Sequence, residues 1–212
     1  MSPICRAPSR SLKATPTSTS TTLRFHAALK DVRTVLCQAT RQAGDDFVTV
    51  TADRYRIDPA LVDVDLWRFQ SLNQQALEAE GDERTRLLEE AAGAYTGDLA
   101  GGLSQDWIEQ EREALRRRIL QTLIQLAGIL EDDEPQRALD ALHRAITIDQ
   151  YAEICYRQIM TLQARLGDRA GVQRTYRRLE DRLEDLNVDP DDETAELLQR
   201  LLRGRPPPGI SR

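Results

Sequence analysis

The sequence predicts a mainly α-helical fold of paired, repeating helices, with one helix and a β-hairpin in front of them. A helical pattern that appears twice between residues 106 and 186 is the first observation behind this prediction. The second is a basic helix followed at once by two strand-like runs, nearer the N-terminus. The third is the composition, because 40% apolar, 30% charged and 5% aromatic residues are ordinary for a soluble, helix-rich protein.

The repeated pattern has the period of a tetratricopeptide repeat. Sliding the second copy onto the first by 34 residues sets Ala138 on Val172, Leu142 on Tyr176 and Ala145 on Leu179. A small residue, a large one four positions later and an apolar one three further is the rhythm of that repeat's second helix. Because one helix pair cannot bury its apolar face alone, such units stack into a solenoid with a binding surface. We expect these residues, with Trp107, to form the repeat core.

Apolar periodicity also places the helices around the two repeats. Helices are expected over residues 65–81 and 82–95, from 106 to beyond 130, from 135 and from 152, after the turn at Gly167 and Asp168, and over 191–202. The first of them should carry Phe69, Leu72, Ala76 and Leu77 in its apolar run. Residues 97–102 are glycine-rich and should form a loop that interrupts the array.

The segment 23–58 has a different pattern. Phe25, Leu29, Val32 and Leu36 recur at spacings of three and four, which predicts a helix whose other face is largely basic and polar. The run FVTVTADRYRI then alternates like two short strands around a tight turn. A basic helix followed by a hairpin is the second half of a winged helix-turn-helix.

Basic and hydroxyl side chains in this segment are the candidate DNA contacts. They are Arg24, His26, Lys30 and Arg33 on the helix, and Thr49, Thr51 and Arg54 on or near the wing. Residues 1–62 hold nine Lys/Arg and five Asp/Glu, net +4, whereas residues 63–212 hold 20 and 30, net −10. A nucleic-acid-contacting front joined to a protein-contacting body has this distribution. The alternative is that the basic helix face is simply solvated.

Several classes of site are excluded by the sequence. No window is apolar enough to span a membrane, and the N-terminus has no secretory h-region. Cys5, Cys37 and Cys155 are far apart with no CxxC spacing, which favours a reducing cytoplasm. His26 and His143 lack a ligand partner at metal spacing. No nucleophile–base pair or phosphate loop is present, so we expect no metal, no cofactor and no enzyme activity.

Three stretches together resemble a known family. RYRIDPALVDVDLWRF, AYTGDLAGGLSQDWIEQEREAL and GDRAGVQRTYRRLEDRLEDLNVDPDDETAELLQRLL are similar to the bacterial transcriptional activator domain. This tetratricopeptide-like module occurs in actinobacterial antibiotic-regulatory proteins, where it follows an OmpR-type winged helix. RFHAALKDVRTVL resembles the recognition helix of that winged helix, and FVTVTADRYRI resembles its wing. A complete winged helix needs roughly fifty more residues before the recognition helix than the 22 found here, so we expect a truncated or divergent one.

The resemblance sets the expected organisation and function. We expect a disordered tail over 1–22, a partial winged helix over 23–58, the helical domain over 63–202 and a second tail over 203–212. The implied protein is a cytoplasmic transcriptional regulator of activator type. Its expected partners are RNA polymerase or another regulator, DNA through residues 24–57, and a second copy of itself. The alternative is an interaction scaffold that has lost its DNA reader.

Overall fold

The computed structural model describes residues 30–31, 34, 48–51, 54–102 and 106–203. The chain divides into two compact units, residues 1–71 and 72–212. Most of the described residues are helical, which confirms the mainly α-helical fold class.

The described residues of the first unit include a two-stranded sheet. Strand β1 (Val48–Thr51) pairs antiparallel with β2 (Arg54–Ile57), so that Val48 faces Ile57 and Thr51 faces Arg54. The strands end where Asp58 begins a turn: its carboxylate accepts a hydrogen bond from the Ala60 amide at 2.9 Å. Helix α2 (Asp65–Glu78) starts in this unit. Of the predicted basic helix, Lys30, Asp31 and Thr34 are described, and all three are helical and exposed.

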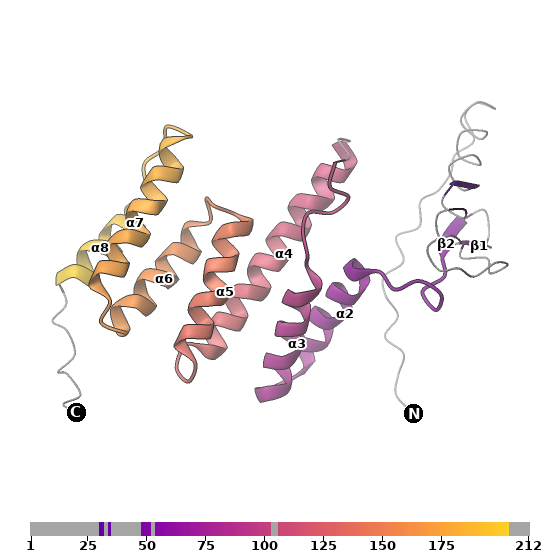
Figure 1. Ribbon diagram of the computed structural model, residues 1–212, viewed down its shortest axis with the longest axis horizontal. Helices are drawn as coiled ribbons and strands as arrows, with labels where there is room; N and C mark the ends of the chain where they lie inside the picture. The colour runs from indigo at the N-terminus through magenta and orange to yellow at the C-terminus, as the bar shows by residue number, and fades with distance from the viewer. Residues whose placement is uncertain (1–29, 32–33, 35–47, 52–53, 103–105, 204–212) are drawn as a thin grey trace. The chain divides into compact units, whose positions relative to one another are not determined.

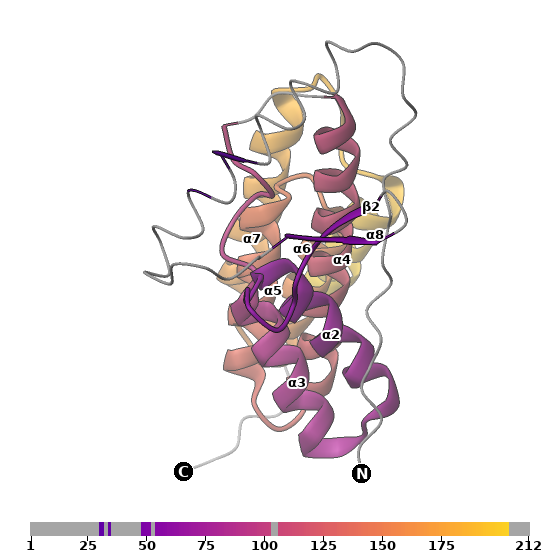
Figure 2. The same ribbon diagram turned by 90° about the vertical axis from the view of Figure 1, so that its right-hand side faces the viewer.

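Consecutive helices of the second unit pack against one another along a row (Figure 1). They are α3 (Gly81–Ala94), α4 (Asp106–Leu130), α5 (Pro135–Ile148), α6 (Glu153–Arg165), α7 (Arg169–Glu184) and α8 (Asp192–Arg203). The most extensive contacts join α4 to α5 and α6 to α7, which are the two predicted repeats, and α8 packs on both α6 and α7. Seen from the side, α4 to α7 lie one behind another (Figure 2).

Local sequence explains where these helices begin and end. Proline lacks the N–H that an interior helix position needs, and Pro135 is accordingly the first residue of α5. Gly167 follows α6 with a φ of +79°, a conformation that glycine adopts without strain. The Asp168 carboxylate then accepts a hydrogen bond from the Gly171 amide at 2.7 Å and caps α7. The predicted turn at Gly167 and Asp168 is confirmed.

The core runs through the helix pairs as a continuous apolar layer. Its largest fully buried side chains in the second unit are Leu88, Ile108, Ile119, Leu123, Leu142, Ile146, Tyr156, Ile159, Met160 and Leu179. Each contributes about 1.5–3 kcal/mol relative to an exposed position. The hydroxyl of Tyr156 donates to the carbonyl oxygen of Gln150 at 3.0 Å, so its one polar atom is satisfied inside the core.

The first predicted helix needs a correction. Phe69, Leu72 and Ala76 are buried, but Leu77 is 63% exposed. Successive residues of a helix are turned by about 100°, so Leu77 lies beside the buried stripe rather than in it. The helix also ends at Glu78, before the expected residue 81, because α3 begins at Gly81 with a φ of +56°.

Candidate functional site

The candidate DNA contacts are described only in part. Lys30 and Thr49 are exposed, and the Thr49 hydroxyl donates to the Arg56 carbonyl oxygen at 3.4 Å. Thr51 and Arg54 belong to the paired ends of β1 and β2. The positions Arg24, His26 and Arg33, and the side chains of Thr51 and Arg54, lie outside the described residues.

The residues of the predicted repeat core differ in burial. Ala138, Leu142 and Ala145 of α5 and Val172 and Leu179 of α7 are at most 2% exposed. Tyr176 is only half-buried and lies at the edge of α7 beside α8. Burial still raises the pKa of its hydroxyl. Trp107 is part of α4, but its side chain lies outside the described residues.

A groove of about 280 Å³ is lined by residues of α4, α5, α6 and the start of α8. Ala127, Leu142 and Leu162 give it an apolar lining. The side chain of Ile154 also lines it and is 48% exposed. Gly128 faces open space, since a Cβ added there would meet no atom within 4 Å. The groove therefore has room for an apolar side chain from outside the chain.

One polar atom of the groove has no partner. The side-chain oxygen of Gln158, on α6, is buried and accepts no hydrogen bond from the described residues. An unpaired buried acceptor typically costs about 1–3 kcal/mol, so a bound N–H donor would recover that loss. A partner with an N–H donor close to an apolar side chain therefore fits this groove.

A polar lock closes the end of the groove by joining α8 to α6. The Thr194 hydroxyl donates to a Glu153 carboxylate oxygen at 2.6 Å and accepts from the Arg157 guanidinium at 3.0 Å. The Glu153 carboxylate also accepts the Asp191 amide at 3.1 Å, and Arg157 pairs with Glu193 at 3.3 Å. Thr194 is fully buried, so the lock positions the groove's acidic end, where Glu193 lies.

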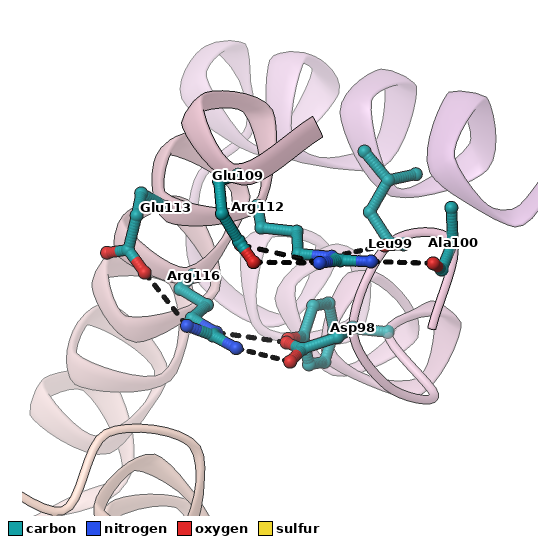
Figure 3. A network of polar contacts seen from close by, with 8 residues as sticks. Asp98, Leu99, Ala100, Glu109, Arg112, Glu113 and Arg116 are labelled. Atoms are coloured by element: carbon teal, nitrogen blue, oxygen red, sulfur yellow. Dashed lines mark hydrogen bonds and ion pairs between the residues drawn. The ribbon is translucent and has the colours of Figure 1, made fainter. Parts of the chain in front are cut away.

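A second polar network holds the loop 97–102 against α4 (Figure 3). The Arg112 side chain is 9% exposed, and it donates to the carbonyl oxygens of Leu99 at 2.7 Å and Ala100 at 2.6 Å. One turn later, Arg116 donates to Asp98 at 3.0 Å and to Glu113 at 2.8 Å. The hydrogen bond from Arg116 lowers the pKa of Asp98. The network fixes the break in the helical array that the sequence predicts.

Of the reactive side chains singled out in the sequence, the structure describes the Cys155 thiol and the His143 imidazole. Cys155 is fully buried, and burial raises the pKa of its thiol to about 12, so it stays protonated. His143 is half-buried, and burial lowers its pKa. Among the described residues, no group of three or more His, Cys, Asp or Glu side chains could hold a metal ion.

Most of the chain matches the sequence model of a known family. Residues 64–202 match the bacterial transcriptional activator domain. The chain belongs to this family. A comparison with curated proteins gives no match. The resemblance inferred from the three sequence stretches is thus confirmed for the helical domain.

Membership in the bacterial transcriptional activator domain family assigns a general role. The family acts in transcriptional activation and is not enzymatic, so the expected absence of catalysis agrees with the family. The expected partners are accordingly DNA or components of the transcription machinery. Within the described part of the chain, no helix is long and apolar enough to cross a membrane.

The sequence patterns did not identify the residues that line the groove or those that hold the loop 97–102. Gln158 and Ile154 have ordinary positions in an amphipathic helix, and only the packing of α8 on α6 shows what they face. Arg112 was missed because its main partners are backbone carbonyls, which leave no side-chain signal. The pairing of Arg116 with Glu113 has the i,i+3 spacing of a helical ion pair, whereas its contact with Asp98 joins residues 18 positions apart and leaves no such pattern in the sequence.

Proposed function

We propose that this chain is a regulator of the antibiotic-regulatory type that holds a protein of the transcription machinery in the groove between α4, α6 and α8. The unpaired Gln158 oxygen beside the exposed Ile154 side chain carries the proposal. A bound segment with an apolar side chain and an N–H donor would satisfy both. RNA polymerase or another regulator is the expected occupant, and residues 63–202 are the domain that binds it.

DNA contact by the front segment completes this proposal. Residues 23–58 would act as a partial winged helix, with the candidate residues of the helix and wing against phosphates and base edges. The exposure of Lys30 and Thr49 supports such contacts, as does the net charge of +4 over residues 1–62. Few phosphates would be neutralised, so the affinity should be modest and should depend only shallowly on salt.

Filling the groove tests the protein-binding proposal. Gly128→Phe puts a ring into open space, and removing a helix-interior glycine should not weaken α4. We expect purified RNA polymerase subunits to be captured about tenfold less well by this variant than by the unaltered chain. Gly93→Phe is the matched control, because Gly93 also faces open space but belongs to α3. Equal capture by both variants would exclude the groove as the binding site.

A mobility-shift assay tests the DNA-binding proposal separately. The full chain should shift promoter fragments at about 50 mM salt and lose the shift as salt rises. Reversing the charge at Lys30 should weaken the shift. If no shift forms at about 50 mM salt, the DNA contact is wrong, and the scaffold alternative stands if polymerase is still captured.

A further inference from the structure

Two exposed carboxylates border the groove of the proposed binding site. The Glu131 side chain is 47% exposed and pairs with Arg165 at 3.4 Å. The Glu193 side chain is 73% exposed and pairs with Arg157 at 3.3 Å. Such exposed ion pairs are weak, because water screens the attraction between the charges. Both carboxylates can therefore receive a further cation.

Each of these two arginines is shared with a second carboxylate. Arg165 also pairs with Asp132, at 2.5 Å. Arg157 donates to the Thr194 hydroxyl, which itself donates to Glu153. In these contacts, four carboxylates share two guanidinium groups. The groove is therefore negatively charged, and it belongs to a helical body with a net charge of −10.

The end of α4 adds to this negative charge. The last carbonyl groups of a helix carry a partial negative charge, which basic side chains in the last turn commonly offset. Helix α4 has no basic residue in its last turn, and Glu131, Asp132, Asp133 and Glu134 follow it directly. An acidic run at this end of a helix opposes helix stability, so its position beside the groove favours a role in binding.

The buried side-chain oxygen of Gln158 requires a hydrogen-bond donor in the same groove. An ammonium or guanidinium group donates several hydrogen bonds and accepts none, so it can donate to this oxygen and pair with a carboxylate at once. The exposed Ile154 side chain and the open space at Gly128 leave room beside it for an apolar side chain. The lining therefore complements a basic side chain next to an apolar one, whereas an acidic segment would be repelled.

We propose that the groove binds a segment of another protein in which a basic side chain lies next to an apolar one. This inference rests on the proposed use of the groove for binding a protein, and it adds the chemistry of the bound segment. The basic side chain donates to Gln158 and pairs with Glu131 or Glu193, while the apolar side chain lies against Ile154. Charge complementarity of this kind selects the partner, and its contribution weakens as salt rises.

Synthetic peptides test this chemistry by fluorescence anisotropy with the full chain. One labelled peptide contains leucine and arginine, a second leucine and glutamate, and a third serine and arginine, all in the same glycine–serine background. We expect the leucine–arginine peptide to bind with a dissociation constant on the order of 100 μM, and the other two about tenfold more weakly. Raising the salt from about 50 mM to about 500 mM should weaken the binding of the leucine–arginine peptide about tenfold.

Variants that lack the bordering charges locate the bound peptide. Glu131→Gln combined with Glu193→Gln should weaken binding of the leucine–arginine peptide about tenfold. Glu83→Gln combined with Glu90→Gln is the matched control. These two glutamates also pair with an arginine and are 57% and 48% exposed, but they belong to α3, which does not line the groove. The control should bind the peptide as the unaltered chain does.

Gln158→Leu separates the buried oxygen from the charges. The change removes the unpaired acceptor and keeps a side chain of similar size, so the thermal unfolding midpoint should not fall. Binding of the leucine–arginine peptide should nevertheless weaken about fivefold. A purely structural role of Gln158 would instead lower the midpoint and leave the affinity unchanged.

The proposal is overturned if no peptide binds at about 1 mM, if the leucine–glutamate peptide binds as tightly as the leucine–arginine peptide, or if the groove and control variants bind alike. Gly128→Phe separates these outcomes from a failure of the proposed function. Loss of polymerase capture in this variant, without a preference among the peptides, would keep the groove as the polymerase site and exclude a basic–apolar segment. Peptide binding that Gly128→Phe abolishes, with polymerase capture unchanged, would keep the basic–apolar segment and exclude polymerase as the occupant.

Discussion

Helices α5 and α8 are both strongly amphipathic, yet they are buried very differently. Helix α5 has neighbours on two sides, α4 and α6, and buries Ala138, Leu139, Ala141, Leu142, Ala145 and Ile146. Helix α8 is the last of the array and buries only Thr194. The apolar pattern of a repeat helix therefore gives full burial only inside the stack, and at the end of the stack polar contacts hold the helix instead.

Truncating one leucine in each helix is the strongest test of this contrast. Leu142→Ala in α5 should lower the free energy of unfolding by about 2–5 kcal/mol, because it leaves a cavity at a 2% exposed position. Leu198→Ala in α8 should cost about 1 kcal/mol, since the side chain is half-exposed and no closed cavity forms. Urea denaturation followed by circular dichroism measures both. Equal losses would show that α8 is buried as tightly as α5.

The polar lock provides a second, smaller test. Thr194→Val removes a hydroxyl that bonds both Glu153 and Arg157, and should weaken the attachment of α8 by about 1–2 kcal/mol. Amide hydrogen exchange should therefore accelerate in α8 more than in α5.

Thr161→Val is the matched control for the polar lock. The Thr161 hydroxyl is exposed and donates to the Arg157 carbonyl oxygen within its own helix, at 2.8 Å. This change should leave α8 exchange as it was. An unchanged exchange rate in the Thr194 variant would mean that the leucines, not the lock, hold the helix.

Sequence patterns predicted burial correctly for helices inside the stack and less well for residues beside its last helix, α8. Apolar spacing predicted the repeats because Ala138, Leu142 and Ala145 are buried on a helix that packs against both α4 and α6. It could not show that Tyr176 would be half-exposed, since that depends on the terminal helix beside it. The spacing of α8 likewise predicts a helix, but not which of its leucines remain uncovered.

Sequence patterns could not predict the groove, because its lining comes from helices that are far apart in the sequence. Ile154 and Gln158 form part of a site only because residues of α4, α5 and the start of α8 line the same groove. The Arg112 network has the same character, because its acceptors are carbonyl oxygens of the loop 97–102. For the front segment, the strand pairing agrees with the predicted hairpin, and the DNA contacts stay a prediction.

The smallest expected effect is a pH dependence that should come from inside the stack and not from its end. Burial lowers the pKa of His143 on α5, and the nearby charge of Arg178 lowers it further, while Asp140 raises it. The folded state thus favours the neutral imidazole.

The contribution of His143 to the free energy of unfolding is fully present above its unfolded pKa of 6.5 and is lost as the pH falls through the lowered folded pKa. Urea midpoints at about pH 8 and about pH 5.5 should therefore differ more for the unaltered chain than for His143→Gln. Identical differences in both proteins would show that His143 is as well solvated in the fold as in the unfolded chain.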